Sequence, residues 1–255
     1  MNIILFEEKE ISSTYHIQIT DHRAKHIVKV LRSQVGDRVR VGVIDGGRGM
    51  AKIVAIKPKF PFSVDLDIQL ETTLPEEKPV IDLVLALPRP IMLRRILSQV
   101  TSLGVGRIFL IDSQRVEKSF WQASLLQNEQ YREHLLIGLE QAVATRLPEV
   151  SIYPKFKGFM DELLVKDLDD YSALIVADPA GTNTFSEALR QAGGSLRQGG
   201  RVLLCVGPEG GWVPAEVDQF SGCGFSICTI GERILKVDTA VIALHSRIMA
   251  LREIL

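Results

Sequence analysis

Short apolar segments alternate with longer helical segments from about residue 80 to the end of the chain. Apolar residues recur every three or four positions in the helical segments, whereas the segments between them are apolar almost throughout. These apolar runs are 80–86, 108–111, 173–177, 202–206 and 226–230. Strands that are apolar on both faces are typical of a parallel sheet covered by helices. The sequence therefore predicts an α/β domain over residues 80–255, with helices near 91–103, 121–144 (possible break), 159–164, 184–191, 214–221 and 239–255.

The first seventy residues follow a different pattern, in which polar and apolar residues alternate. Alternation of this kind is typical of half-buried strands, and the expected strands are 3–6, 16–19, 38–43, 50–56 and 63–70. A helix is expected to follow Thr20, as its N-cap, and to end near Arg32. We therefore expect a small β-barrel or sandwich domain over 1–72, joined to the α/β domain by a polar, proline-containing linker at 73–79.

Charge is unevenly distributed along the chain, although the formal net charge is only −1. Residues 1–60 hold 11 Lys/Arg and 6 Asp/Glu, a net of +5, so the other residues carry a net of −6. A basic surface of this kind can follow a phosphate backbone, and an ordinary solvated surface is the alternative. The candidate RNA-binding residues here are Arg23, Lys25, Lys29 and Arg32.

Neither targeting nor metal-binding signals stand out. No run approaches the roughly 18 apolar residues that span a bilayer, and the N-terminus lacks the basic start of a signal peptide, so we expect a cytoplasmic protein without membrane partners. The cysteines, Cys205, Cys223 and Cys228, form no Cys-x-x-Cys pair, and the five histidines are scattered. We expect neither a disulfide framework nor a metal site.

Three loops after expected strands carry the candidate ligand-binding residues. Residues 207–212 read Gly-Pro-Glu-Gly-Gly-Trp, residues 178–181 read Asp-Pro-Ala-Gly, and a third loop spans 231–240. Glycine allows backbone conformations closed to other residues and lets a ligand approach the main chain. A single glycine loop is commonly just a turn, but open α/β sheets bind ligands where several strands end. The three loops together predict a binding pocket at one edge of the sheet.

Motifs that the sequence lacks restrict the kinds of ligand that this pocket can bind. There is no Gly-x-Gly-x-x-Gly after the first strand of the α/β domain and no Gly-x-x-x-x-Gly-Lys-Ser/Thr, the usual cradles for dinucleotides and triphosphates. A Gly-x-Ser-x-Gly elbow and a metal-spaced histidine pair are absent too. S-adenosylmethionine fits such a site, because its adenosine needs main-chain hydrogen bonds and an apolar slot and it carries no phosphate.

The loop sequences resemble the signature of the SPOUT methyltransferases. Gly207-Pro208-Glu209-Gly210-Gly211, followed by residues 230–240, is similar in particular to the ribosomal RNA small-subunit methyltransferase E family, which methylates ring nitrogen 3 of a uridine. The similarity extends, in order along nearly the whole chain, to residues 26–32 with Gly36-Asp37, to 103–105, and to Glu140-Gln141 with 146–149.

This resemblance implies a PUA-like RNA-binding barrel followed by an α/β domain with a deep C-terminal trefoil knot. It also implies a homodimer that acts on ribosomal RNA or on the assembled small ribosomal subunit. The implied contacts to S-adenosylmethionine are Asp178, Pro179, Val206, Gly207, Pro208, Glu209, Gly210, Gly211, Ile230, Gly231, Leu235, Thr239 and Ala240. Thr239 and Ala240 are expected to open the last helix, and plain core packing is the alternative for Leu235.

Catalytic and RNA-binding roles are implied for residues outside the cofactor contacts. Arg233 and Lys236 are candidates for fixing the RNA or favouring the deprotonated base, with surface salt bridges as the alternative. Glu140 and Gln141 are candidates for orienting the base, although such a pair is commonly a solvated helix face. Arg146 joins the expected RNA-binding residues. No general base is indicated.

The chain also departs from the family pattern. The departures are Ser102, Ala144, Lys236, Val237 and Asp238. They leave the cofactor residues in place but keep a second function open, a non-catalytic or altered-specificity RNA-binding or ribosome-associated protein. A nucleotide-dependent metabolic enzyme is disfavoured by the missing phosphate motifs.

Overall fold

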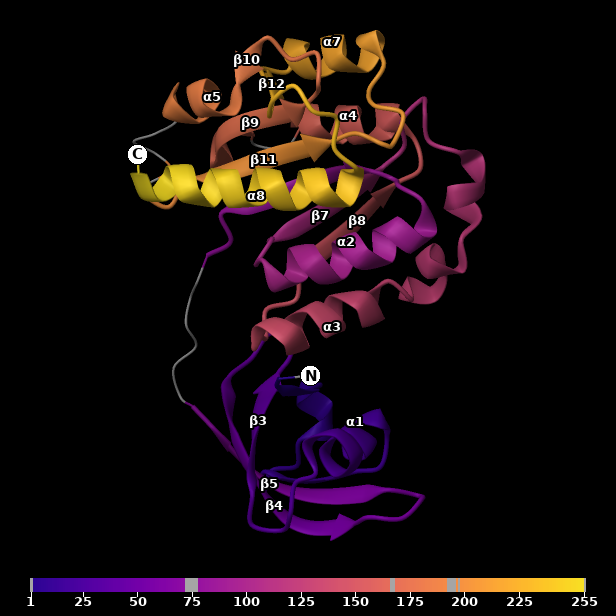
Figure 1. Ribbon diagram of the computed structural model, residues 1–255, viewed down its shortest axis with the longest axis vertical. Coiled ribbons are helices and arrows are strands. Elements are labelled where there is room, and N and C mark those ends of the chain that lie inside the picture. The colour runs from indigo at the N-terminus through magenta and orange to yellow at the C-terminus, as the bar shows by residue number, and fades with distance from the viewer. Residues whose placement is uncertain (1, 72–77, 166–167, 192–195, 197, 255) are drawn as a thin grey trace. The chain divides into compact units, whose positions relative to one another are not determined.

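The computed structural model describes residues 2–71, 78–165, 168–191, 196 and 198–254 (Figure 1). The chain divides into two compact units. The first comprises Met1–Glu77 and Leu136–Leu147, and the second Lys78–Leu135 and Pro148–Leu255. Most of the expected linker, 73–79, lies outside the described residues. Leu136–Leu147, which the sequence pattern assigns to the α/β domain, groups with the N-terminal residues.

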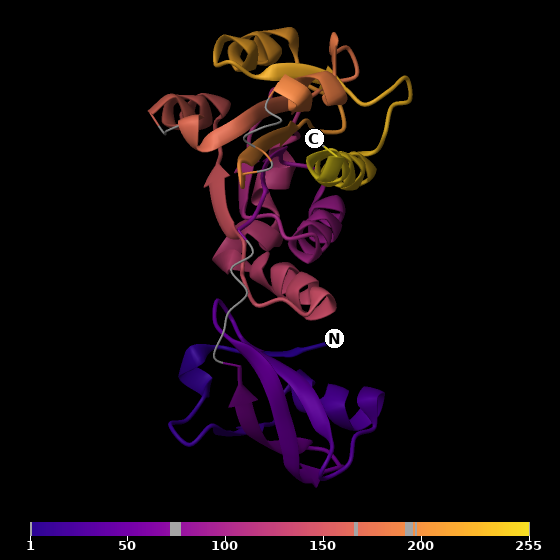
Figure 2. The same cartoon turned by 90° about the vertical axis from the view of Figure 1, so that its left-hand side faces the viewer.

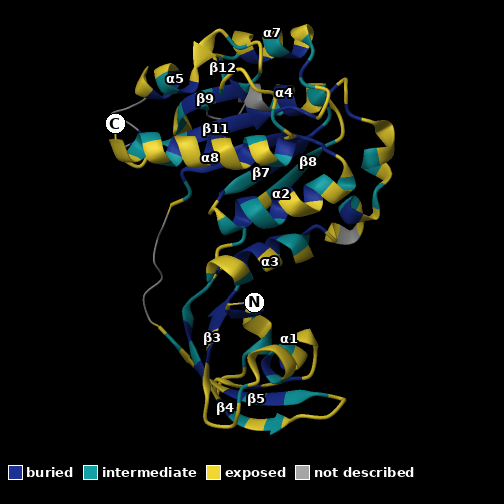
Figure 3. Cartoon of the chain, in the orientation of Figure 1, coloured by how far each residue is buried: buried dark blue, intermediate teal, exposed yellow. Residues whose placement is uncertain are grey.

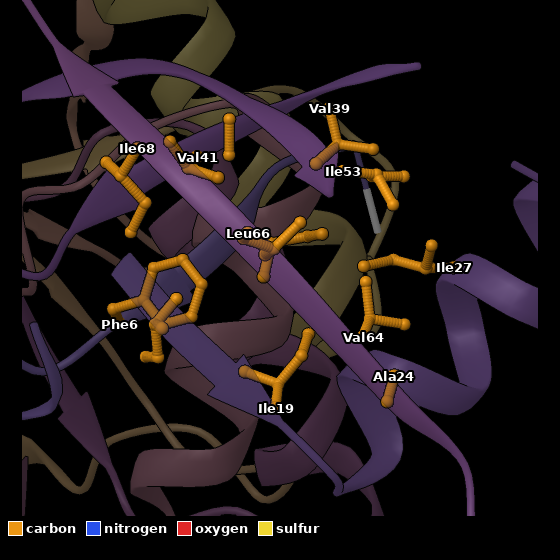
Figure 4. Packing of buried hydrophobic residues seen from close by; sticks show 13 residues of the cluster. Phe6, Ile19, Ala24, Ile27, Val39, Val41, Ile53, Val64, Leu66 and Ile68 are labelled. Carbon is orange, nitrogen blue, oxygen red and sulfur yellow. The ribbon is translucent and has the colours of Figure 1, made fainter. Parts of the chain in front are cut away.

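The first unit is built on a five-stranded sheet that contains every strand expected there. The spatial order is β1-β3-β4-β5-β2, with β1 parallel to β3 and the other pairs antiparallel. The strands are β1 (Ile4–Phe6), β2 (His16–Ile19), β3 (Arg38–Val43), β4 (Arg48–Lys57) and β5 (Ser63–Leu70). Because side chains alternate across each strand, every second residue faces inward. These residues pack with Ala24 and Ile27 to form the core of the unit (Figure 4).

The helix of the first unit differs in detail from the expected one. A short η1 turn (Glu8–Glu10) precedes β2, and helix α1 (His22–His26) continues as the π-helical turn η2 (Ile27–Leu31). Asp21, not Thr20, is the N-cap, because its carboxylate accepts the Arg23 amide at 2.8 Å. Arg32 ends the turn with φ +54°, in the left-handed region.

Residues Leu136–Leu147 are held in the first unit by the turn between β3 and β4. The Thr145 hydroxyl donates to the Gly46 carbonyl at 2.8 Å, and the Arg48 guanidinium donates to the Val143 carbonyl at 3.0 Å. A Cβ on Gly42 would lie only 2.6 Å from Cγ2 of Thr145. The apolar side of this segment packs on a small cluster that contains Ile3, Leu5, Leu139 and Ala144. The family departure at Ala144 is thus part of an apolar contact.

The second unit contains a seven-stranded sheet in which all neighbouring strands are parallel, as the apolar runs predict. The spatial order is β10-β12-β9-β11-β6-β7-β8. The strands are β6 (Ile81–Ala86), β7 (Arg107–Ile111), β8 (Glu149–Tyr153), β9 (Tyr171–Ala177), β10 (Asn183–Thr184), β11 (Arg201–Val206) and β12 (Ser226–Thr229). The edge strands β8 and β10 were not expected, because neither has a buried residue (Figure 3).

Helices of the second unit lie close to their expected positions. They are α2 (Pro90–Ser102), α3 (Arg132–Ala142, whose last turns belong to the first unit), α4 (Phe156–Val165), α5 (Phe185–Gln191), α7 (Pro214–Gly222) and α8 (Val237–Ile254). Helices α2 and α8 lie side by side over one face of the sheet (Figures 1 and 2). The expected break in 121–144 is real, since 3-10 turns η3 (Lys118–Gln122) and η4 (Ser124–Glu129) precede α3. A further 3-10 turn, η5 (Leu168–Asp170), leads into β9. Helix α8 begins at Val237, so Thr239 and Ala240 lie inside its first turn and do not open it.

A buried carboxylate near the start of β6 ties four strands together. Asp82 is fully buried and accepts the Arg107 amide at 2.9 Å and the Tyr171 hydroxyl at 2.6 Å. The Arg201 guanidinium also donates to it. Burial and the bond to this carboxylate raise the pKa of Tyr171 well above its ordinary value. The group therefore links β6, β7, β9 and β11 at the amino end of the sheet.

A pH effect on stability is expected from two histidines in the second unit, His245, which is buried, and His134, which is half-buried. Burial lowers the pKa of His245 below 6.5, although a hydrogen bond with the Leu103 backbone opposes the shift, and burial with Arg94 also lowers the pKa of His134. The unfolded chain then binds more protons below about pH 6.5. The free energy of unfolding should be unaffected above that pH and fall as the pH drops below it, by at most about 1.4 kcal/mol per pH unit per histidine. Urea titrations between pH 7.5 and 5 measure this slope; His245→Gln should reduce it, and an unchanged slope would assign it to other groups.

Among the residues with described positions, no helix is both long enough and apolar enough to cross a membrane. Cys205, Cys223 and Cys228 are all free thiols. Burial raises the pKa of Cys228 to about 11, so this thiol is protonated at neutral pH.

Candidate functional site

The sheet order brings the three expected loops to one edge. Strands β12, β9 and β11 are neighbours and run parallel, so the loops that follow them leave the sheet at the same end. These loops comprise residues 178–181 after β9, 207–213 after β11 and 230–236 after β12. We call them the carboxyl-edge loops. All belong to the second unit.

The loop after β9 packs tightly on the end of β12. The Asp178 amide donates to the Cys228 carbonyl at 3.0 Å, and the Asp178 carboxylate accepts the Ala180 amide at 2.7 Å. A Cβ on Gly181 would lie 2.6 Å from the carbonyl carbon of Cys228, so only glycine fits there. Pro179 is exposed. The Asp178 side chain therefore stabilises the turn in which it lies.

The loop after β11 is built around an indole. Trp212 is only 4% exposed and lies against Gly207, where a Cβ would come within 3.1 Å of the indole nitrogen. That buried nitrogen has no hydrogen-bond partner within the described part of the chain. The Gly211 amide donates to the Pro208 carbonyl at 2.8 Å, and Gly211 has φ +73°, which side chains other than glycine rarely adopt.

Residues that follow β6 and β7 hold this loop in place, and the sequence analysis did not identify them. The Arg89 amide, after β6, donates to Glu209 Oε1 at 3.1 Å, and the Arg115 guanidinium, after β7, donates to the Gly210 carbonyl at 2.5 Å. Glu216, buried in the first turn of α7, accepts from Val213, Ser113 and Gln114. Arg89 and Arg115 also follow strands of the same sheet, so the rule that selected the other loops could have found them.

The loop after β12 is more open. Ile234 is 85% exposed, Arg233 and Lys236 are exposed, and Leu235 is half-buried. Gly231 has φ +144°, and the Arg247 guanidinium from α8 donates to the Ile230 carbonyl at 3.1 Å. Buried Val237 begins α8, and Asp238 follows it in the first turn. A negative charge there interacts favourably with the positive end of the helix dipole. The departures at Val237 and Asp238 are therefore compatible with the start of a helix.

The other proposed catalytic residues lie elsewhere. Glu140 is half-buried and Gln141 exposed, and both belong to the first unit, where the Asn2 amide donates to the Glu140 carbonyl at 2.9 Å. Burial raises the pKa of Glu140, against the attraction of nearby His22 and Arg23. The two residues are thus not part of the unit that carries the carboxyl-edge loops.

Arg23 differs from the other expected RNA-binding residues. Its side chain is only 12% exposed, and it donates to Glu10 at 2.6 Å, to Asp21 at 2.7 Å and to the Leu5 carbonyl at 2.8 Å. Burial alone would lower its pKa, but the bonds to Glu10 and Asp21 raise it above the ordinary value. Arg23 therefore stabilises the first unit. The others, Lys25, Lys29, Arg32 and Arg146, are exposed.

The residues present fit S-adenosylmethionine. Two glycines with positive φ, Gly211 and Gly231, leave main-chain groups uncovered by a Cβ, and the Trp212 indole N–H is a buried donor without a partner in the described structure. The apolar residues there are Leu235, which is half-buried, and Val206, which is buried at the end of β11. In the part of the chain that the structure describes, no cluster of three or more His, Cys, Asp or Glu residues is placed to hold a metal.

Comparisons with known proteins show which families the chain is similar to. The chain matches an RNA methyltransferase domain over residues 75–249 and an RNA methyltransferase PUA domain over 19–65. The ribosomal RNA small subunit methyltransferase E of Treponema pallidum is 30% identical over 98% of this chain and 91% of its own length. The protein of the same name from Bacillus subtilis is 24% identical over 97% of this chain and 95% of its own.

Solved structures show the same fold. The ribosomal RNA small subunit methyltransferase E from Neisseria gonorrhoeae, determined with bound S-adenosyl methionine, aligns with a TM-score of 0.77 at 22% identity, over 98% of each chain. This likeness confirms the expected fold class, a SPOUT α/β domain preceded by a PUA-like domain. The domain matches and the relative from Treponema pallidum show that the chain belongs to the ribosomal RNA small-subunit methyltransferase E family of RNA methyltransferases.

Proposed function

We propose that the protein transfers a methyl group from S-adenosylmethionine to ring nitrogen 3 of a uridine in small-subunit ribosomal RNA. The observation that carries this proposal is the convergence of the three carboxyl-edge loops, with their uncovered main chain, at one edge of the sheet in a member of this family. Ribosomal RNA as substrate makes the cytoplasm the expected location.

The carboxyl-edge loops are proposed to bind the cofactor. Gly207, Gly211 and Gly231 would face it with main-chain groups, and Val206 and Leu235 with apolar surface. The other expected contacts are Asp178, Pro179, Pro208, Glu209, Gly210, Ile230, Thr239 and Ala240. When bound, the cofactor supplies an activated methyl group. The task of the protein is then mainly to align the acceptor base and exclude water.

RNA is proposed to contact both units. Lys25, Lys29, Arg32 and Arg146 would bind phosphates on the first unit. Arg233 and Lys236, exposed beside Gly231, would hold the target nucleotide after it leaves its stack. The ammonium group of Lys236 is a compact point charge and lacks the planar guanidinium group of arginine, which can donate two parallel hydrogen bonds. Glu140 and Gln141 stay candidates for orienting the base.

A homodimer is also part of the proposal. Ile91 of α2 and Ile242 of α8 are exposed apolar residues on the two helices that lie side by side. A subunit interface would cover these two side chains, and symmetric dimers are the commonest soluble oligomers. Sedimentation equilibrium gives the mass of the assembly directly, and a purely monomeric protein would remove this part of the proposal.

The proposed activity is tested by methyl transfer from labelled S-adenosylmethionine. Small ribosomal subunits and naked ribosomal RNA, both from a strain that lacks the modification, serve as acceptors, and the modified nucleotide is then mapped. Label at ring nitrogen 3 of one uridine is the expected result. Cofactor binding without transfer to either acceptor would favour the non-catalytic RNA-binding alternative, and no cofactor binding at millimolar ligand would exclude the methyltransferase.

Simultaneous replacement of Lys25, Lys29 and Arg32 by alanine should weaken RNA binding. Each lost phosphate contact reduces the magnitude of the slope of log K against log salt by roughly 0.7–0.9, so the three together should reduce it by about 2 to 3. Fluorescence anisotropy at several salt concentrations measures the slope. Replacing Lys118, Lys155 and Lys157, exposed lysines of the second unit, removes the same charge and is the control. An unchanged slope in the variant of Lys25, Lys29 and Arg32 would contradict the proposal that these residues bind RNA phosphates.

A further inference from the structure

We propose that Phe60, in the loop between β4 and β5, is a stacking platform for an unpaired RNA base. The inference rests on the proposed function, because it assumes that the first unit binds the RNA substrate. It adds a recognition element for single-stranded RNA to a surface that otherwise offers only charge.

Phe60 is unusually exposed for an aromatic residue. It is 87% exposed, the highest value among the large hydrophobic residues that the structure describes as exposed. Phenylalanine normally buries most of its large apolar surface, so at this exposure the ring is open to a partner. A single exposed apolar residue needs no explanation by itself, and the argument therefore depends on what surrounds the ring.

The ring of Phe60 is supported by a neighbour that is anchored in the core. Phe62 packs against the apolar core of the first unit. The two rings meet edge to face, with centroids 6.3 Å apart and planes at 87°. A supported ring loses less conformational freedom when it binds a partner than an isolated side chain does.

Cationic residues lie close to these two rings, in space or along the chain. Nζ of Lys29, from η2, lies 5.4 Å from the centroid of the Phe62 ring. Lys57 and Lys59 precede Phe60 along the chain, both are exposed, and residues 57–62 include no acidic residue. Flat apolar surface beside positive charge fits a nucleic-acid strand, whose bases stack on aromatic rings while lysines attract its phosphates. Only an unpaired base can stack in this way, because duplex RNA keeps its bases inside the helix.

The test compares variants of Phe60 in the full-length protein. The probe is a fluorescent, uridine-rich single-stranded RNA of about twelve nucleotides, within the usual range of such sites. Phe60→Ala should weaken binding roughly 5- to 100-fold, Phe60→Trp should preserve it, and Phe60→Leu should behave like alanine, since leucine is apolar but does not stack. The salt slope should stay unchanged in Phe60→Ala and decrease in Lys59→Gln. Because Phe60 is exposed, thermal stability and cofactor affinity should not change in any variant.

Two controls separate stacking from other contacts. An oligonucleotide of the same length with abasic sites should bind wild type and Phe60→Ala equally, since it has no base to stack. Equal affinity of wild type and Phe60→Ala for the normal RNA would overturn the inference. Full binding by Phe60→Leu would also overturn it, and would indicate an apolar contact with the RNA that does not depend on stacking. If wild type transfers methyl groups but Phe60→Ala binds RNA normally, only this inference fails; if wild type neither binds nor methylates RNA, the proposed function fails.

Discussion

Replacing Gly211 with valine is expected to reduce the affinity for S-adenosylmethionine by about 100-fold or more, an effect readily measured by calorimetry. Gly211 has φ +73°, where an L-residue is strained by roughly 1–2 kcal/mol and a β-branched one by more. A Cβ at this position would meet no steric clash, because it would lie 3.8 Å from Arg115 Nη1, an ordinary van der Waals distance. The effect should come from the backbone, which would shift and move the Gly210 carbonyl away from Arg115.

The matched control for this variant is Gly104→Val. Gly104 has φ +80° with open space around it, in the turn between α2 and β7, so valine imposes similar strain far from the carboxyl-edge loops. It should lower stability but leave cofactor affinity unchanged. Gly211→Asn, which tolerates the left-handed conformation better, should recover part of the affinity. Near-normal binding by Gly211→Val would mean that the cofactor does not contact this loop.

Asp82→Ala is expected to lower the free energy of unfolding by about 3–5 kcal/mol, the usual effect of breaking a buried ion pair. The variant leaves the Arg201 guanidinium, the Tyr171 hydroxyl and the Arg107 amide without their common acceptor. Urea denaturation measures the loss. Asp82→Asn preserves the shape of the side chain and an acceptor oxygen but removes the charge. Its free energy of unfolding should therefore lie between those of the wild type and Asp82→Ala.

The same variant should leave the binding site intact. Asp82 is the second residue of β6, at the opposite end of the strand from the loop that holds Arg89. The folded fraction of Asp82→Ala should therefore bind S-adenosylmethionine as wild type does. A loss of stability below about 1 kcal/mol would show that the buried charge is compensated in another way.

Local sequence patterns predicted most of the fold because the spacing of apolar residues reflects which side chains are buried. The continuous apolar run at β11 could only be an inner strand, and the glycines after it could only be a turn. The same reasoning missed β8, since an edge strand with partly exposed residues throughout carries no such run. Helix α8 begins two residues before the position that the sequence predicts, because the apolar Val237 does not differ from the loop residues that precede it.

The site was less predictable than the fold, because its contacts join distant parts of the chain. The positions of Arg89 and Arg115 after strands were predictable, but their contacts to Glu209 and Gly210 span 120 and 95 residues and leave no local pattern. Charge counting also cannot separate an exposed lysine from Arg23, whose charge is used inside the first unit. The roles of Arg233 and Lys236 stay predictions.

The return of Leu136–Leu147 to the first unit has a consequence for synthesis of the protein. The turn between β3 and β4 requires Thr145 and Val143, which leave the ribosome only after β6 and β7 have been made. The N-terminal unit therefore cannot be completed during translation before part of the second unit is available. A fragment that stops at the end of the first unit's own sheet would leave Ile3 and Leu5 without their contacts to Leu139, so we do not expect the N-terminal residues to fold as a separate module.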